Sequence, residues 1–233
     1  MSAGRWTVMS DLCEGDEGNG PLRSVRLEVA QALSHTLPGP AAWSFMSPPF
    51  RSEDDLVPRR EREGFREASV MILLHPARGG ISFPVVERPG SMRHHAGQLA
   101  LPGGALEPGE SPLEAALRET EEEIGIRVPG SAVLGALSEI SALPSGYHVH
   151  PFIALLDEDP LYRLRREEAE NLFEIPLASL TDPRSVSALP MRWGDEDWSV
   201  PCYDFGGRPI WGLTAMILAE FKAILLPGRR GSV

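Results

Sequence analysis

The stretch GALEPGESPLEAALRETEEEIGI, residues 104 to 126, decides the fold because it contains one complete helix with its start and stop signals. Ser111, Pro112 and Glu114 have the pattern of an N-cap, a first helical residue and the partner of a capping box. Gly125 is a typical helix stop, so we predict a helix from Pro112 to about Ile124. Apolar spacing assigns its buried side to Leu113, Leu117, Thr120 and Ile124.

A second side of this helix carries Glu119, Glu122 and Glu123, at positions i, i+3 and i+4. Three neighbouring carboxylates repel one another and weaken an isolated helix. Hard cations such as magnesium and manganese prefer oxygen ligands, so a bound cation would turn this repulsion into coordination. The helix alone leaves another interpretation open, a solvated acidic face with Arg118 as an ordinary ion-pair partner.

Spacing outside the helix separates these interpretations. Five residues lie between Gly104 and Glu110, seven more precede Arg118, and the chain then continues as Glu-Thr-Glu-Glu-Glu-Ile-Gly-Ile. This resembles the Nudix box, Gly-x5-Glu-x7-Arg-Glu-U-x-Glu-Glu-x-Gly-U, where U is bulky and apolar. All seven fixed letters match, with Thr120 a mild departure at an apolar position. Chance would give such a match on the order of once in a million chains of this length, which favours the site over the solvated face.

The resemblance implies an α/β fold, a Nudix α/β/α sandwich with a mixed β-sheet and a loop-helix-loop catalytic motif. It also implies cleavage of a diphosphate by water that a Mg²⁺ or Mn²⁺ ion activates. Arg118 then orients a glutamate, and Glu110 is a secondary ligand or a structural support. The residues implied as metal ligands and catalytic groups are Glu119, Glu122 and Glu123, joined by the Gly104 carbonyl.

The segment before the box bears on the substrate. It resembles the signature of Nudix coenzyme A diphosphatases, with matches at Arg88, Arg93, Gly97, Pro102, Gly103 and Gly104. Departures fall at Pro84, Val86, Pro89 and Leu101. Arginines here could donate to phosphate oxygens. The expected substrate-binding residues are therefore Arg88, Arg93, His95, Gly97 and Gly103, although the His94–His95 pair also fits a solvated loop.

Three segments downstream of the box, residues 143–151, 167–177 and 210–215, also resemble that subfamily. Glu167 and Glu168 fall in its acidic loop, and Glu168 is our candidate for a further ligand or general base, with a solvated charge cluster as the alternative. We expect hydrolysis of coenzyme A or acyl-CoA to 3',5'-ADP and (acyl-)4'-phosphopantetheine. Two alternatives remain: a Nudix diphosphatase for ADP-ribose, a nucleotide sugar or a dinucleoside polyphosphate, and a non-catalytic Nudix-fold ligand-binding or interaction module.

Length and composition set the remaining expectations. The 233 residues carry a formal net charge of -11, which argues against nucleic-acid partners and a polybasic membrane surface. With two cysteines and no hydrophobic leader near residues 1–20, we expect a cytoplasmic protein, with a homodimer left open. The expected domains are an N-terminal extension (1–67), partly mobile with one helix near residues 22–33, the Nudix domain (68–226) and a C-terminal tail (227–233). Residues 38–49 and 51–66 are expected to be a linker or a solvated face.

The expected sheet begins with a hairpin of residues 68–74 and 81–87, which are rich in Val and Ile. Residues 133–137 and 149–156 are further strand candidates, and residues 211–226 are expected to form a closing helix. Strands thus alternate with helices within one unit, which favours a mixed α/β layered domain.

Overall fold

The computed structural model describes residues 20–51, 64–90, 97–142, 146–165 and 167–226. Its N-terminal part holds α1 (Gly20–Leu33), α2 (Pro40–Trp43) and the 3₁₀ turn η2 (Ser44–Met46). The central part holds β1 (Arg66–Ala77), β2 (Gly80–Glu87), β3 (Leu99–Ala100), β4 (Gly103–Ala105), α3 (Pro112–Ile124), η4 (Gly130–Ala132), β5 (Val133–Ala136), β6 (Ile140–Ala142) and β7 (Tyr147–Leu155). The C-terminal part holds β8 (Asn171–Pro176), α4 (Leu177–Thr181), η6 (Pro183–Ser185), β9 (Val186–Trp193), β10 (Glu196–Asp204), β11 (Pro209–Trp211) and α5 (Gly212–Leu225).

The main sheet is mixed and has the strand order β3-β2-β1-β7-β5, with β4 paired to β1, β6 to β7 and β8 to β2. The long central pair, β1 and β7, is parallel and joins Arg66 to Tyr147 and Leu74 to Leu155. Its other pairs are antiparallel, including the expected β1–β2 hairpin. The predicted α/β class with a mixed sheet is confirmed.

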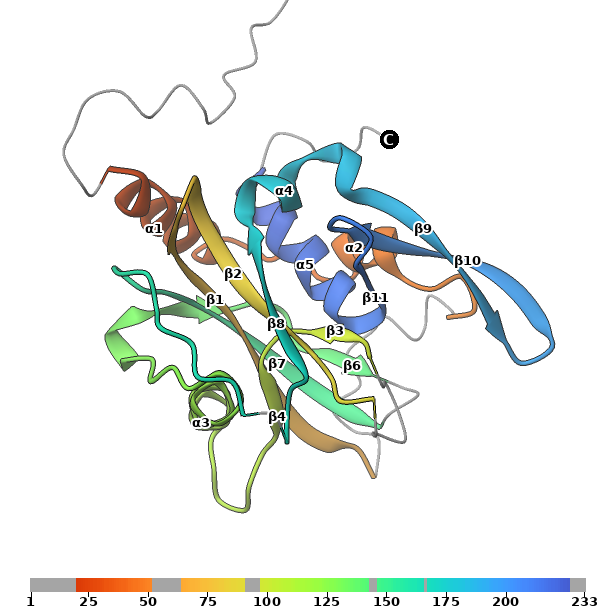
Figure 1. Ribbon diagram of the computed structural model, residues 1–233, viewed down its shortest axis with the longest axis horizontal. Helices are drawn as coiled ribbons and strands as arrows, with labels where there is room; N and C mark the ends of the chain where they lie inside the picture. The colour runs from red at the N-terminus through yellow and green to blue at the C-terminus, as the bar shows by residue number, and fades with distance from the viewer. Residues whose placement is uncertain (1–19, 52–63, 91–96, 143–145, 166, 227–233) are drawn as a thin grey trace, which may run out of the picture.

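Helices cover the sheet on both faces (Figure 1). Successive strand residues point to opposite faces, and β1 shows this directly. Ile72 and Leu74 join the larger hydrophobic cluster, which includes buried residues of α1 and α5, whereas Met71 and Leu73 join a smaller cluster with Ile124 of α3. The helix that carries the Nudix box therefore has one face of the sheet largely to itself.

The N-terminal segment differs from the expected linker. Residues 40–46 form α2 and η2; α2 packs against α5, and Trp43 at its end is completely buried. The expected helix near residues 22–33 is α1, with Leu22, Val25 and Val29 buried. This segment is therefore part of the packed core and holds more than one helix. Its prolines suggested a linker, and the burial of Trp43 could not be read from them. Most of the charged run 51–66 lies outside the described residues.

A second, three-stranded antiparallel sheet of order β11-β10-β9 was not predicted. Its long β9–β10 hairpin projects from the main body in Figure 1, and Trp193 near its tip stacks on Phe50 with ring centroids 4.8 Å apart. Within the described ranges, no helix has the length and apolar character needed to cross a bilayer.

Candidate active site

The box helix forms as the sequence predicts. Ser111 is the N-cap, its side chain accepts a hydrogen bond from the Glu114 N–H, and the Glu114 side chain accepts one from the Ser111 N–H. Gly125 ends the helix in the left-handed region, at φ 73°. The predicted buried side is confirmed for Thr120 and Ile124, and Leu117 packs against the same cluster although it is only partly buried. Leu113 is also only partly buried, and Ala115 and Ala116, which were not predicted, are fully buried.

Thr120, the departure from the box, is accommodated by its own helix. Its hydroxyl donates a 2.6 Å hydrogen bond to the Ala116 carbonyl and is fully buried. A buried hydroxyl without a partner would cost about 1–3 kcal/mol, and this bond removes that penalty. The polar atom is therefore compatible with the apolar position it occupies.

Arg118 holds the acidic side of the helix together. Its Nε lies 2.8 Å from Glu110, and its Nη1 lies 2.8 Å from Glu119 and 2.9 Å from Glu122. Its Nη2 donates to the Ala105 carbonyl and again to Glu110. These contacts raise the pKa of Arg118 and lower that of Glu110. One guanidinium thus spaces three carboxylates and ties the loop before the helix to the helix itself.

Glu119 and Glu123 are held against the glycine turn. The Gly103 N–H donates to a Glu123 oxygen at 3.1 Å. Burial raises the pKa of Glu119, and it raises the pKa of Glu123 to about 8, although the Gly103 hydrogen bond and the charge of Arg88 act in the opposite direction. Carboxylates placed where ionisation is costly are typical of functional sites.

Of the predicted site residues outside the box, Arg88 and Glu168 lie near the box glutamates. The charges of Arg88 and Glu168 act on Glu123, so the structure brings both near the box. Glu168 also pairs with Arg165 at 3.0 Å. Gly97 donates its N–H to the Arg88 carbonyl. Arg93 and His95 lie outside the described residues, and their predicted roles stay predictions.

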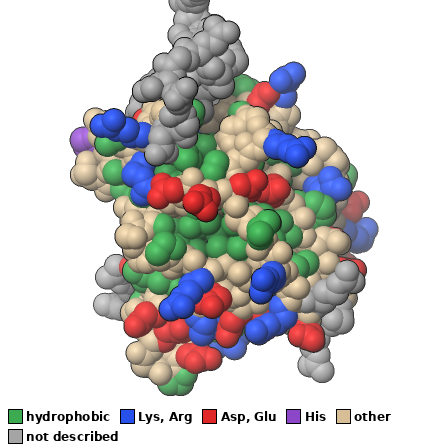
Figure 2. Space-filling view, turned by 60° about the vertical axis from the view of Figure 1, so that its left-hand side comes forward, with side chains coloured by type: hydrophobic (Ala, Val, Ile, Leu, Met, Phe, Trp, Pro, Cys, Tyr) green, Lys and Arg blue, Asp and Glu red, His purple; other side chains and the backbone are tan. Residues whose placement is uncertain are grey.

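The glycine turn fits a cation held by oxygen ligands. A Cβ at Gly104 would overlap the Glu119 carboxylate, so only glycine lets the carbonyl of residue 104 and that carboxylate share this space. Its donors are carboxylates and a carbonyl, the ligands that magnesium and manganese prefer. Figure 2 shows acidic and basic side chains intermixed in the lower part of one face, at the height of α3 in Figure 1.

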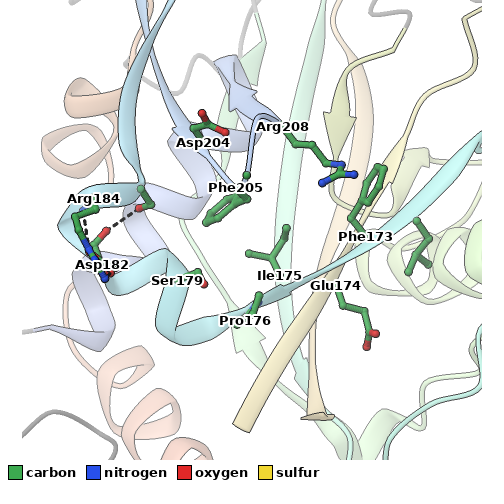
Figure 3. A pocket seen from close by; sticks show the side chains of 13 residues that line it. Phe173, Glu174, Ile175, Pro176, Ser179, Asp182, Arg184, Asp204, Phe205 and Arg208 are labelled. Carbon is green, nitrogen blue, oxygen red and sulfur yellow. Dashed lines mark hydrogen bonds and ion pairs between the residues drawn. The ribbon is translucent and has the colours of Figure 1, made fainter. Parts of the chain in front are cut away.

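A hollow in the described part of the chain lies elsewhere. It has a volume of about 700 Å³ and is lined by β8, α4 and the β10–β11 turn, with none of the box glutamates. In Figure 3, Arg208 points to the ring of Phe173, with its Cζ 4.4 Å from the centroid, and Glu174 points away from the cavity. Its volume would suit a ligand, but the residues that match the box do not line it.

Sequence reasoning missed two groups of side chains. In the part of the chain that the structure describes, Glu67, His148 and His150 bring one ligand atom each within 4.8 Å of one another, and so do His75, Asp159 and Glu174. The box glutamates belong to neither group, and Arg118 Nη1 donates to both Glu119 and Glu122. The His-x-His spacing on a strand could have indicated the first group, since it puts both imidazoles on one face.

A carboxylate helix entered through a glycine turn, on a mixed sheet between helical layers, defines a protein of the Nudix class. The NUDIX domain profile matches residues 65–195. The chain belongs to the Nudix hydrolase family, and it is an enzyme that hydrolyses a pyrophosphate linkage.

Known proteins similar to this chain agree with that assignment. An Escherichia coli K12 protein described as "Uncharacterized Nudix hydrolase NudL" is 32% identical over 163 residues, which cover 69% of this chain and 83% of the relative. A Yersinia enterocolitica protein with the same description is 36% identical over 135 residues, 58% of this chain and 69% of the relative. The crystal structure of a MutT/nudix family protein from Enterococcus faecalis has a TM-score of 0.50 at 16% identity, covering 84% of this chain and 71% of its own, and shows the shared fold.

Proposed function

We propose that this enzyme is a divalent-metal-dependent diphosphatase that hydrolyses coenzyme A or acyl-CoA to 3',5'-ADP and (acyl-)4'-phosphopantetheine. The observation that carries the substrate is the segment that runs from Arg88 to the glycine turn. Its spacing matches the coenzyme A diphosphatase signature, and Arg88 lies close enough to Glu123 for its charge to lower the pKa of that carboxyl. A phosphate-binding arginine beside the cleavage carboxylates is what a diphosphate substrate requires.

Each residue has a distinct task in this proposal. The metal, Mg²⁺ or Mn²⁺, neutralises the diphosphate and activates the attacking water when it is bound. Arg118 keeps Glu119 and Glu122 in place through its 2.8 and 2.9 Å contacts. Glu168 is the candidate general base, and Arg88 and Arg93 hold phosphate oxygens, with His95, Gly97 and Gly103 completing the substrate loop. The ligands are Glu119, Glu122, Glu123 and the Gly104 carbonyl.

The substrate is tested with a panel. The purified full chain is incubated with magnesium and, in separate reactions, coenzyme A, acetyl-CoA, ADP-ribose, a nucleotide sugar and a diadenosine polyphosphate, and the products are identified by mass. We expect the coenzyme A reactions to be fastest and to release 3',5'-ADP. Fast cleavage of ADP-ribose without turnover of coenzyme A would contradict the proposed substrate but not the assignment as a diphosphate hydrolase.

Arg88→Gln sharpens the same test. Loss of the guanidinium should raise the KM for coenzyme A by about tenfold, since a charge-assisted hydrogen bond contributes about 1.5 kcal/mol or more. Arg78→Gln, at the β1–β2 turn and away from the box, is the matched control and should leave KM unchanged. Equal effects of the two substitutions would remove Arg88 from substrate binding.

The domain arrangement remains part of the proposal: an extension over residues 1–67, the catalytic unit over 68–226 and a tail over 227–233. α1 and α2 contact α5, so deleting the extension would expose core and would not isolate its role. A homodimer is better tested on the intact chain. Sedimentation equilibrium at several concentrations should give either the 25.4 kDa monomer or twice that mass.

A further inference from the structure

A group of histidine and glutamate side chains lies beside the box helix but apart from its carboxylates. Glu67 is on β1, and His148 and His150 are on β7. We propose that these three residues form a second metal site, specific for zinc or a similar transition-metal ion, with Glu139 beside it. The site is distinct from the one that serves diphosphate cleavage.

Strand register brings the three residues together. In the parallel β1–β7 pair, Glu67 is level with His148, and His150 lies two residues further along the same strand. Residues level across a pair, and residues two apart on one strand, share a face of the sheet. Met71 of β1 and Ala154 of β7 show that this is the face on which α3 packs. The three side chains therefore lie next to one another on one face of the central strand pair.

The three ligand atoms are close enough to converge on one tetrahedral ion. Ligand atoms about 2.0–2.1 Å from a zinc ion lie roughly 3.3–3.4 Å from one another. Here one ligand atom each of Glu67, His148 and His150 lies within 4.8 Å of the other two. Glu67 Oε2 is 2.6 Å from His150 Nε2, and a Glu139 oxygen is 3.1 Å from His148 Nε2. The two imidazole rings are nearly perpendicular, with centroids 5.2 Å apart. Small changes in side-chain torsion angles would let Glu67, His148 and His150 bind one ion together.

Donor chemistry favours a transition metal over magnesium. Imidazole nitrogen is a ligand for zinc, whereas magnesium selects oxygen and water. His148 Nδ1 lies 3.2 Å from the Ser141 hydroxyl, a contact of the kind that fixes the orientation of a ligating ring. The His148 side chain is 4% exposed and that of Glu67 is 49% exposed, so the group is anchored at one end and open to solvent at the other.

The second histidine group serves as a contrast. His75 Nδ1 lies 2.8 Å from the Pro76 carbonyl and must donate to it, so Nε2 is left to accept from the Tyr162 hydroxyl at 2.7 Å. Both ring nitrogens thus have short contacts with neutral groups that do not ligate zinc in ordinary sites. His75 is better explained as a structural residue.

Topology separates the proposed site from the diphosphatase carboxylates. Gly103 and Gly104 of β4 pair with one edge of β1, whereas the histidines are on β7 at its other edge. A hollow of about 340 Å³ links His150 and Glu139 to Ser111, Pro112 and Leu113 at the start of α3. The two sites therefore lie on different sides of the strand on which the box helix rests.

Zinc binding to the intact protein tests the proposal. The full chain is stripped with a chelator, saturated with magnesium to occupy the carboxylate site, and titrated with Zn²⁺ by calorimetry. We expect one equivalent to bind in the presence of magnesium, and Co²⁺ in its place should give the visible absorption of a tetrahedral site. Binding is measured without turnover, so the result does not depend on the substrate.

Variants locate the ion. His150→Ala and Glu67→Gln should each weaken Zn²⁺ binding at least tenfold. The Glu67 side chain is half-exposed, and circular dichroism checks that both variants keep the fold. Asp159→Asn in the His75 group is the matched control and should leave binding unchanged, as should Glu122→Gln in the box. Absence of a magnesium-resistant equivalent, retention of it in both His150→Ala and Glu67→Gln, or its loss in Asp159→Asn would overturn the proposal.

Discussion

Two helices of this enzyme each carry a glutamate shielded from solvent, Glu220 fully and Glu123 in part, and the surroundings of the two carboxylates are opposite. Glu220 of α5 accepts hydrogen bonds from the Gly39 N–H at 3.0 Å, the Trp43 indole at 3.1 Å and the Ser138 hydroxyl at 2.6 Å. Glu123 of α3 accepts one from the Gly103 N–H and lies near the charges of Arg88, Glu119 and Glu168. Burial raises the pKa of both groups.

The difference between these surroundings indicates a structural role for Glu220 and a functional role for Glu123. The neutral donors around Glu220 come from the N-terminal segment and the main domain, so this carboxylate joins the two parts of the chain. The neighbours of Glu123 include the like charges of Glu119 and Glu168, whose repulsion lowers the stability of the fold unless a bound cation offsets it. Sites that lower stability in this way are expected where catalysis needs them. Substitutions should therefore affect stability at α5 and activity at α3.

The largest effect is expected for Glu122→Gln. Removing one ligand charge should reduce turnover at least about 100-fold and weaken magnesium binding. The Glu122 side chain is 38% exposed, so the free energy of unfolding should change by less than about 1 kcal/mol. Steady-state kinetics and chemical denaturation measure the two quantities. Glu121→Gln, on the exposed side of α3, is the control, and turnover of Glu122→Gln within threefold of it would contradict the ligand role.

Next in size is Glu220→Ala. It leaves three donors without their partner, and each buried unpaired group costs about 1–3 kcal/mol, so we expect unfolding to become easier by about 3 kcal/mol. Urea denaturation measures this loss. Activity per folded molecule should stay normal, because Glu220 is remote from α3. A variant as stable as the parent would show that water replaces the carboxylate at no cost.

Gly104→Ala should have a smaller effect, confined to activity. The new Cβ would overlap the Glu119 carboxylate and displace it, so we expect turnover to fall about tenfold while the fold is kept. Gly103→Ala is the contrasting variant: at φ 154° its Cβ would meet the Ser69 carbonyl and the backbone of Val70, and the protein should lose stability instead. Thermal melting and kinetics on both variants distinguish the two glycines.

The smallest effect is a difference in pH dependence. The pKa of Glu220 is raised above 4.5 in the folded protein, so its contribution to stability is complete below that pH and is lost as pH rises through the raised pKa. Glu220→Gln cannot titrate at this position. The free energy of unfolding of the parent, measured relative to Glu220→Gln, should therefore fall as pH is raised from 4 to 8. A constant difference would show that the carboxyl has an ordinary pKa.

Local sequence signals were sufficient for the box helix. Ser111, Glu114 and Gly125 define its ends through contacts within four residues, and the spacing of its glutamates follows from helix geometry alone. The β1–β2 hairpin and α5 were predicted from their apolar patterns for the same reason. The proximity of Arg88 and Glu168 to the box came from the family resemblance rather than from any local rule.

Contacts between distant segments account for what the sequence did not reveal. Glu220 lies 177 residues from Trp43, so no local pattern indicates that α2 is buried against α5. Glu67 and His148 are joined by the parallel register of β1 and β7, which sequence does not specify. The hairpin of β9 and β10 was missed because its exposed residues have no continuous apolar alternation.

The parallel β1–β7 pair has a consequence for the order of folding. The 69 residues from 78 to 146 are synthesised between the two strands, so β1 leaves the ribosome well before its central neighbour exists. Pairing at such long sequence separation is slow because loop closure must be completed before any contact is gained. The box helix α3 forms from local signals, yet the sheet on which it packs is complete only when β7 has paired with β1. Maturation of the active site should therefore follow the kinetics of strand closure rather than those of helix formation.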